Sequence, residues 1–405
     1  MKNILIIGGG FAGVWSAAAA VRAARAHGVP QSELQVTVVS SGDDMVIRPR
    51  LYEADPEQMR VALDRVLGPI GVRRIAATVT GIDTSTRMVT AVDRSGRNTL
   101  LSYDRLVLAT GSQLVRPSIP GSQWIYDVDS LDAAASLEHH LRRLPQREAT
   151  AGRFTAVVIG AGFTGLEIAT ELVSRLRAVA GDADDVRVVM VERADAVGPE
   201  LGEGPRPYIS SALSDLGVEL RLGKTVERVT ESEVELSDGE VLPASTVIWT
   251  AGVAASPLTQ YIPGERDRIG RLRVDEFLRV LGAPEVFAAG DTAAATAEEG
   301  HTVMQSCQHA TPLGKFAGHN VAADVLGLDL APFAPNPYVT CLDLGPAGAV
   351  VTTGWDRTVQ KTGEKGKELK RQINAEWIYP PVDDADAILK LADHQEEFSM
   401  EAFYA

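Results

Sequence analysis

Cysteine is nearly absent from this chain. Cys307 and Cys341 are the two present, which is too few for a disulfide framework or for a cysteine-based zinc cluster. A chain with so little cysteine fits the reducing cytosol, so we expect a cytoplasmic protein with no metal site.

Runs of basic residues and long apolar runs are also missing. The formal net charge is −15, and phosphate binding depends on clustered cationic side chains, which argues against nucleic acid as a partner. Anionic membrane surfaces repel such a chain on average. No stretch reaches the ~18 consecutive apolar residues of a membrane-spanning helix. We therefore expect no transmembrane segment and at most weak peripheral association with a membrane.

The length of 405 residues exceeds what one hydrophobic core normally holds and predicts two or three domains. Apolar residues make up 45% of the chain and charged residues 23%, as in soluble globular proteins. A largely disordered or fibrous chain is therefore disfavoured.

A strand, glycine turn and helix pattern occurs twice. Residues 4–27 begin with an apolar run, turn at glycines and continue into an alanine-rich, helix-favouring stretch, and residues 157–172 repeat this order. The two turns consist of Gly8, Gly9, Gly10, Phe11, Ala12 and Gly13 in the first unit, and of Gly160, Ala161, Gly162, Phe163, Thr164 and Gly165 in the second.

Each glycine of these turns has its own task in dinucleotide binding. The first, Gly8 or Gly160, permits the tight turn, and the second, Gly10 or Gly162, lets backbone N–H groups approach a pyrophosphate. The third glycine of each turn allows close helix packing. The helix N-terminus then supplies free N–H donors and a partial positive charge. Two such units in matching contexts predict two dinucleotide sites.

The next strand of each unit ends at an equivalent position. Ser40 and Glu192 lie at the same distance from the last glycine of their turns. A carboxylate there accepts hydrogen bonds from an adenosine ribose and repels a 2′-phosphate, so Glu192 predicts NADH rather than NADPH. The adjacent Arg193 leaves open stacking on adenine or acceptance of a 2′-phosphate. In the first unit, Ser40 holds the ribose, or Asp43, Asp44 or water does, or Ser40 merely ends the strand.

Two further strands end alike, one at Thr110-Gly111 and the other at Ala251-Gly252. Glycine there lets the chain leave a sheet beside a bound nucleotide. These positions are expected to mark the crossings out of the first domain and back into it.

With these motifs, residues 1–325 resemble the two-dinucleotide-binding-domain flavoproteins, and among them most closely the type II NADH dehydrogenases. The resemblance also rests on the segment Phe287-Ala288-Ala289-Gly290-Asp291. It implies an α/β fold with two Rossmann-like domains and a small α+β C-terminal domain. We predict a discontinuous FAD domain at 1–115 and 250–330, an NADH domain at 116–249 and an interface domain at 331–405.

The resemblance also implies roles for single residues. Gly290 and Asp291 would hold the ribityl and pyrophosphate region of FAD. Arg48, in the loop 48–53, would lie beside the flavin and favour its reduced anionic form, although pairing with surface carboxylates is the alternative. Glu167 would assist proton movement near the nicotinamide.

The match weakens at the acceptor site and in the tail. Gln308 matches a glutamine near the quinone pocket, but Pro312-Leu313 replace a Gln-Gln pair. Cys307 and Cys341 are either a redox pair or ordinary buried side chains. Beyond residue 331 we expect strands at 338–344 and 349–354 and a helix starting near 367. The acidic tail 383–405 lacks the basic face of a membrane-docking helix, which favours a soluble or homodimer-forming role.

The predicted function is an FAD-dependent NADH:acceptor oxidoreductase that passes hydride from NADH to FAD and then electrons to a quinone-like acceptor. A flavoenzyme similar to sulfide:quinone or ferredoxin reductases is one alternative. An FAD- and NADH-binding protein that responds to redox state with negligible turnover is another.

Overall fold

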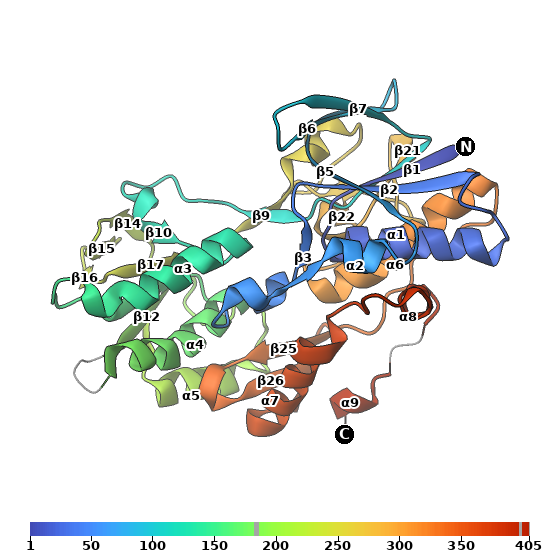
Figure 1. The fold of residues 1–405 in the computed structure, drawn as a ribbon. Coiled ribbons are helices and arrows are strands. Elements are labelled where there is room, and N and C mark those ends of the chain that lie inside the picture. The colour runs from blue at the N-terminus through green and yellow to red at the C-terminus, as the bar shows by residue number, and fades with distance from the viewer. Residues whose placement is uncertain (182–185, 397–398, 405) are drawn as a thin grey trace.

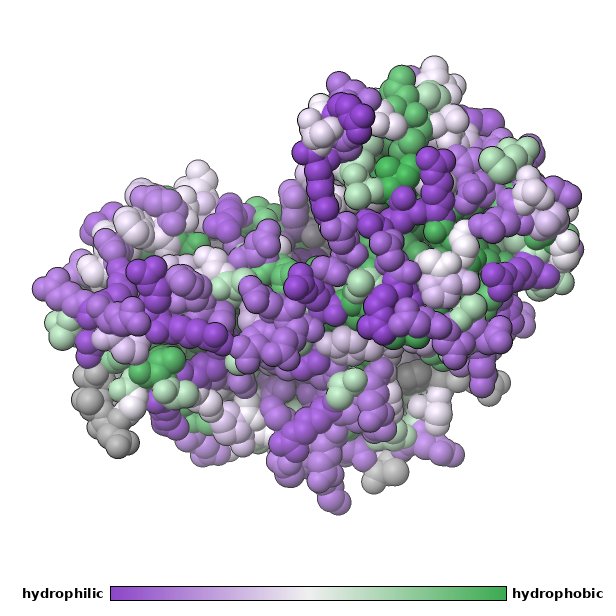
Figure 2. All heavy atoms as spheres, viewed as in Figure 1, coloured by the Kyte–Doolittle hydropathy of each residue, from purple (hydrophilic) through white to green (hydrophobic). Residues whose placement is uncertain are grey.

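The computed structural model describes residues 1–181, 186–396 and 399–404. Two parallel-stranded sheets with flanking helices lie next to each other, and a smaller C-terminal part lies against both (Figure 1). This arrangement confirms the predicted α/β class. The visible face is mainly hydrophilic, with hydrophobic residues in small separate areas (Figure 2).

The first sheet has eight strands, and five neighbouring ones are parallel. In spatial order its strands are β20 (Arg279–Val280), β21 (Ala283–Ala288), β8 (Arg105–Leu108), β1 (Lys2–Ile7), β2 (Leu34–Ser40), β5 (Arg73–Asp83), β6 (Met88–Asp93) and β7 (Asn98–Ser102). The central β1 is an apolar run because both faces of the sheet are covered. Strands from 279–288 thus complete a sheet that starts at the N-terminus.

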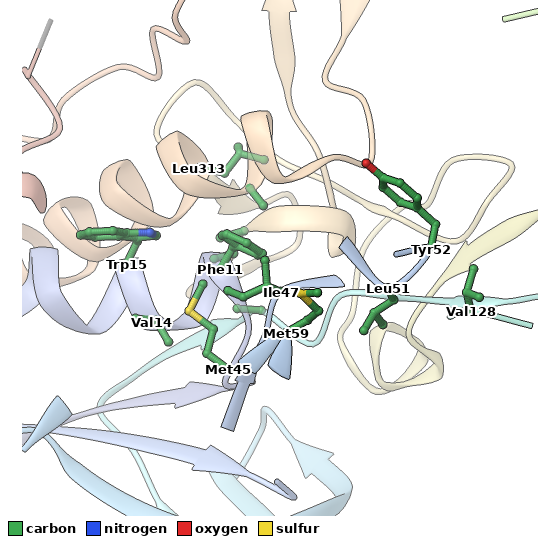
Figure 3. Packing of buried hydrophobic residues seen from close by; sticks show 14 of the residues in the cluster. Phe11, Val14, Trp15, Met45, Ile47, Leu51, Tyr52, Met59, Val128 and Leu313 are labelled. Atoms are coloured by element: carbon green, nitrogen blue, oxygen red, sulfur yellow. The ribbon is translucent and has the colours of Figure 1, made fainter. Parts of the chain in front are cut away.

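Two helices lie side by side on one face of this sheet (Figure 1): α1 (Phe11–Ala26) and α6 (Cys307–Leu326). Small residues line their contact, and a Cβ on Gly318 would lie only 2.1 Å from the Ser16 carbonyl oxygen. Aromatic, aliphatic and methionine side chains fill the layer between the helices and the loops that follow β2 (Figure 3). The first turn of α1 is therefore held between the sheet and α6.

The second sheet is parallel throughout. Its strands in order are β10 (Ile125–Tyr126), β17 (Thr246–Trp249), β11 (Thr155–Ile159), β12 (Arg187–Glu192) and β13 (Glu219–Leu222). Its helices are α3 (Leu131–Arg143), α4 (Phe163–Ala180) and α5 (Arg206–Leu216), and a small antiparallel sheet joins β14 (Val226–Val229), β15 (Glu233–Leu236) and β16 (Val241–Pro243).

The two crossings between the sheets pair with each other. β9 (Ser112–Leu114) and β18 (Val253–Ala255) form an antiparallel two-stranded ribbon in which Leu114 faces Val253. Short elements complete this half of the molecule: β3 (Asp44–Val46), β4 (Arg60–Ala62), α2 (Leu63–Leu67), β19 (Leu272–Arg273), β22 (Ala293–Ala294), β23 (Thr296–Glu298) and β24 (His301–Thr302). Short 3₁₀ turns lie at 48–50, 56–58, 122–124, 144–146, 257–261, 290–292 and 345–347.

The C-terminal part is an antiparallel sheet followed by helices. It consists of β25 (Val339–Asp343), β26 (Ala349–Thr353), β27 (Thr358–Lys361), α7 (Gly363–Gln372), a π-helical turn (Ile373–Trp377), α8 (Ala385–Leu391) and α9 (Glu401–Tyr404). The two expected strands are confirmed, whereas the helix starts earlier than 367, after Thr362 and with Glu364 in its first turn. Ile388 of the tail is buried. Phe398, another apolar tail residue, lies outside the described residues.

Candidate functional site

The first glycine turn links β1 to α1, and its backbone leaves no room for side chains at Gly8 and Gly13. Gly8 has φ +120, and a Cβ there would lie 2.1 Å from the Ala109 carbonyl oxygen. A Cβ on Gly13 would lie 2.0 Å from the Gly8 carbonyl oxygen. Gly10, in contrast, caps α1 with extended backbone and has nothing within 4 Å of its absent Cβ. A side chain would therefore clash with the backbone at Gly8 and Gly13, but there is free space at Gly10.

The second turn repeats this geometry. Gly160 has φ +104, and a Cβ on Gly165 would lie 1.9 Å from the Gly160 carbonyl oxygen. Gly162 caps α4 with no side chain and nothing within 4 Å. Thr250 Oγ1 donates to the Ile159 carbonyl oxygen at 3.0 Å, which fixes the start of the turn against the strand that ends at Ala251-Gly252. Thr164 is exposed in the first turn of α4.

Both helix ends suit an anionic ligand because no side-chain cap is found for them in the described part of the chain. Beside the first turn, Thr110 Oγ1 is buried and has no partner among the described residues. An unpartnered buried hydroxyl next to an open glycine turn fits a bound polar group. Gly111 follows with φ +68, while Phe11 and Ala12 are buried in the helix.

Asp291 lies close to the first glycine turn. It belongs to the 3₁₀ turn Gly290–Thr292, and a Cβ on Gly290 would lie 2.8 Å from the Ala12 Cβ. Burial raises the pKa of the Asp291 carboxyl, against the opposing effects of the Ser112 hydroxyl and Arg48. Ser112 Oγ donates to Asp291 Oδ2 at 2.6 Å. The predicted FAD residues of two distant segments thus meet at the start of α1.

Arg48 joins this group from the loop after β3. Its Nη1 donates to Ser112 Oγ at 2.9 Å and lies 3.7 Å from Asp291 Oδ2, while Nη2 pairs with Asp129. The neighbouring Arg50 pairs instead with Glu53 at 2.6 Å. Arg48 therefore has carboxylate partners and also faces the predicted flavin anchor.

The two equivalent strand ends differ in their surroundings. Glu192 is buried, with Oε2 accepting from Ala161 N at 2.7 Å and Oε1 from Ala194 N at 2.9 Å, so the carboxylate lies on the second glycine turn. Arg193 is exposed.

In the first unit, Ser40 lies against the turn, because a Cβ on Gly9 would lie 2.6 Å from Ser40 Oγ. The nearby carboxylates are already paired: Asp43 with Arg74 and Arg94, and Asp44 with Arg60. Among the polar groups considered for the first ribose, the Ser40 hydroxyl is thus the one seen against the glycine turn.

Glu167 forms a buried ion pair with Lys370, which the sequence did not single out. Lys370 Nζ lies 2.9 Å from Glu167 Oε1 and donates to the Cys341 carbonyl oxygen at 3.1 Å. Asp343 N also donates to Glu167 Oε1, at 3.2 Å. Burial raises the pKa of the Glu167 carboxyl although Lys370 opposes it. Burial disfavours the Lys370 ammonium, but Glu167, Cys341 and Asp343 together outweigh this and raise the pKa of Lys370.

Tyr52 extends this buried network to the loop that carries Arg48. Its hydroxyl donates to Asp343 Oδ2 at 3.0 Å and accepts from Asn374 Nδ2 at 3.3 Å. Burial, with neighbouring carboxylates, raises the pKa of Tyr52 well above its usual value. Asn374 also donates to Glu53 at 2.8 Å. Residues of the loop after β3, of α4 and of the C-terminal part therefore meet here.

The acceptor-side residues lie at the start of α6. Gln308 is partly exposed, and its Nε2 donates to the Pro337 carbonyl oxygen at 3.2 Å. Cys307 and Cys341 are free thiols. Burial raises the pKa of Cys307 to about 11 and that of Cys341 to about 12. Reactive cysteines need a thiolate, so these values disfavour a redox pair at neutral pH.

A stack of rings next to Gln308 was also missed. His309 stacks on Tyr338 with ring centroids 5.2 Å apart, Tyr338 on Trp355 at 4.2 Å, and Trp355 on His301 at 4.5 Å. Burial lowers the pKa of His309 to about 4. These residues come from separate segments of the chain, so no local sequence pattern predicts that their rings stack.

Among the described residues, no helix combines the length and apolarity needed to cross a membrane.

Comparison with known proteins finds matches over most of the chain. The family model described as pyridine nucleotide-disulphide oxidoreductase matches residues 2–314. NADH dehydrogenase-like protein MT1860 of Mycobacterium tuberculosis is 45% identical over 395 residues, which cover 97% of this chain and 98% of that protein. Demethylphylloquinone reductase NdbB of Synechocystis sp. is 29% identical over 359 residues, 86% of either chain. The solved structure of NDH2 from Plasmodium falciparum in complex with NADH has a similar fold, with a TM-score of 0.78, 96% coverage of both chains and 14% identity.

Proposed function

The chain belongs to the pyridine nucleotide-disulphide oxidoreductase family, and we propose that it is an FAD-dependent NADH:acceptor oxidoreductase whose acceptor is a quinone-like molecule. The observation that carries this proposal is the pair of glycine turns. Each one caps a helix N-terminus with no side chain and leaves open space over Gly10 or Gly162. Relatives named for NADH dehydrogenase and for quinone reduction support the choice of donor and acceptor.

We assign FAD to the first turn because Asp291 and Arg48, both half-buried, lie beside it. The part with residues 1–115 and 250–330 would bind FAD, and 116–249 would bind NADH. A flavin, when bound, accepts hydride from a dihydronicotinamide and passes electrons on to an acceptor. In this chain, Arg48 lies 3.7 Å from the anchor Asp291, and its positive charge would favour the reduced anionic form of a flavin bound there.

Glu167 and Lys370 are assigned to proton handling. Glu167 lies in the first turns of α4, directly after the second glycine turn, and is buried against Lys370. Lys370 donates directly to Glu167 over 2.9 Å, so a proton can pass between the two groups along this hydrogen bond. The Asp343 N–H also holds the Glu167 carboxylate in place, and the Tyr52 hydroxyl binds the Asp343 side chain. Gln308 at the start of α6 would orient the acceptor.

The proposal is tested by anaerobic titration of the purified yellow protein with NADH. Loss of the flavin absorbance on adding NADH supports it, and no loss at saturating NADH contradicts it. Steady-state assays with ubiquinone and menaquinone analogues, a dye acceptor and oxygen then identify the acceptor. Reduction of the flavin with turnover below about one per minute for every acceptor, against typical values of 1–10³ per second, would favour a redox-responsive binding protein.

A further inference from the structure

The loop 48–58 lies across the boundary between the two sheets. It follows β3 of the first half, yet three of its residues bind residues of the second half: Arg48 pairs with Asp129, the Tyr52 carbonyl oxygen accepts from Arg175 at 2.9 Å, and Asp55 pairs with Arg142. Leu51 of this loop and Val128 of the second half also belong to one apolar cluster (Figure 3). Any displacement of this loop therefore changes how the two halves fit.

Of these partners, Asp129 is the one that pairs with Arg48. It follows β10 of the second sheet, and both its carboxylate oxygens are used. Oδ1 accepts from Arg48, and Oδ2 accepts from Leu114 N of β9 at 3.0 Å. Its own N–H donates to Asp127 Oδ1 at 3.0 Å. Asp129 thus ties the second sheet to the crossing strand and to Arg48.

Arg48 continues this connection to the first sheet. Its Nη1 donates to the Ser112 carbonyl oxygen at 3.2 Å and to Ser112 Oγ at 2.9 Å, and Ser112 Oγ donates to Asp291 Oδ2 at 2.6 Å. A continuous set of charge-assisted hydrogen bonds therefore runs from β10, through Arg48 and Ser112, to the carboxylate that we assign to the flavin.

We propose that Asp129 is a positioning residue, which acts through Arg48 to set the alignment of the NADH-binding half with the flavin-side loop. This inference rests on the function proposed above. Hydride transfer needs the reacting atoms in contact distance and aligned, and small displacements cost rate steeply. Among the described residues, Asp129 is linked to Asp291 through Arg48 and Ser112.

The sign of the effect separates positioning from simple electrostatics. Replacing Asp129 by Asn removes a negative charge beside Arg48, which favours the anionic reduced flavin and raises its midpoint potential. By charge alone, reduction by NADH would therefore be as fast or faster. Positioning predicts slower reduction instead. The side-chain amide of the Asp129→Asn variant would face either Arg48 or the Leu114 N–H with its NH₂ group, two donors against each other, so one of these hydrogen bonds is lost.

The test is anaerobic stopped-flow reduction of the flavin at saturating NADH in the parent, Asp129→Asn and Asp55→Asn. Asp55→Asn is the matched control: it breaks the charge pairing with Arg142 on the same loop, but both side chains are more than half exposed, and Asn tolerates the φ of +53 found there. We expect Asp129→Asn to keep its flavin, to have an unchanged or higher potential, and to be reduced on the order of 10-fold more slowly. Asp55→Asn should stay within about twofold of the parent.

The variant Arg48→Met completes a double-mutant cycle. If Asp129 acts through Arg48, the double variant is no slower than Arg48→Met alone, and an additive slowing overturns that route. Loss of flavin from Asp129→Asn, or reduction as fast as in the parent, overturns the inference itself. Failure of NADH to reduce the parent protein instead overturns the proposed function, so the two failures are distinguished.

Discussion

At the scale of single residues, Gly10 and Gly162 differ from the other glycines of their turns. Both have extended backbone, with φ/ψ of −84/−170 and −77/−172, which any residue adopts, and neither has an atom within 4 Å of its absent Cβ. A side chain at either position therefore costs the fold little. What it excludes is the ligand.

Replacing Gly10 by Val should give a folded but colourless protein, because the side chain occupies the space assigned to the FAD pyrophosphate. Replacing Gly162 by Val should leave yellow protein that NADH no longer reduces efficiently, since the second turn is assigned to the transient nucleotide. Flavin absorbance and anaerobic NADH titration of both variants measure this. If the Gly162 variant loses flavin and the Gly10 variant keeps it, the two sites are assigned the wrong way round.

Replacing Glu192 by Ala should raise KM for NADH at least about 10-fold and leave flavin content unchanged. The magnitude follows from about 1.5–3 kcal/mol for hydrogen bonds to a charged group, and the Ala161 and Ala194 N–H groups also lose their acceptor. Steady-state kinetics with NADH and NADPH provide the measurement, with Arg193→Ala as the companion variant. Equal kcat/KM for the two nucleotides in the parent would contradict the assignment of Glu192 to NADH selectivity.

At the scale of elements, the helix α7 is fixed to α4 through one buried ion pair. Lys370 of α7 and Glu167 of α4 are each only 9% exposed at the side chain. Removing one member of such a pair leaves the other charge buried without a partner.

Replacing Lys370 by Met should therefore lower the free energy of unfolding by about 3–5 kcal/mol. The double variant Lys370→Met, Glu167→Gln should recover part of this loss, because no buried charge is then left over. Lys365→Met, at an exposed position of the same helix, is the control and should change stability little. Denaturant unfolding measures all of these, and equal losses in the single and double variants would argue against the ion pair as the cause.

A second pair of titrating groups holds the tail against α6. His319 of α6 and His394, which follows α8, have ring centroids 3.9 Å apart, and Phe316 packs edge-on against His394. Burial and neighbouring cations lower the pKa of His319 to about 4 and lower that of His394. Arg22 and Asp393 form an ion pair beside them.

Because the fold favours the neutral rings, their contribution to stability is present above the usual histidine pKa of about 6.5 and is lost as the pH falls toward 4. We expect faster amide exchange in 385–396 at pH 5 than at pH 7, after correction for intrinsic rates. The variant His319→Phe keeps a ring at this position without its charge, and its tail should show a weaker pH dependence. An unchanged dependence in that variant would rule out His319 as the titrating group.

At the scale of the whole molecule, the features that the sequence predicted are local in the chain. The confirmed family resemblance and α/β class could be predicted because each glycine turn, with its strand and helix, lies within about twenty-five residues of the chain. Lys370 was missed because it lies 203 residues from Glu167, and its burial depends on the docking of α7. The ring stack of His301, His309, Tyr338 and Trp355 was missed for the same reason. The residue roles assigned to the two cofactors stay predictions.

Removal of the flavin should destabilise the whole molecule, because a ligand that binds only the native state adds stability in proportion to the logarithm of its concentration over Kd. At a free FAD concentration 100-fold above Kd this amounts to about 2.7 kcal/mol. Thermal unfolding of the yellow protein, of protein stripped of flavin, and of stripped protein with FAD added back measures it. An unchanged Tm after stripping would show that the flavin contributes nothing to the fold.

The strand order of the first sheet also determines when that sheet can be finished during synthesis. β21 pairs with β8, but the ribosome makes it only after the entire second sheet, so a nascent chain carries β8 with one unpaired edge for the whole of that interval. Exposed strand edges invite pairing with other chains. The second sheet, whose strands are contiguous in the chain, is free to fold first. The time needed to translate residues 109–288 therefore sets how long this edge of β8 stays unpaired.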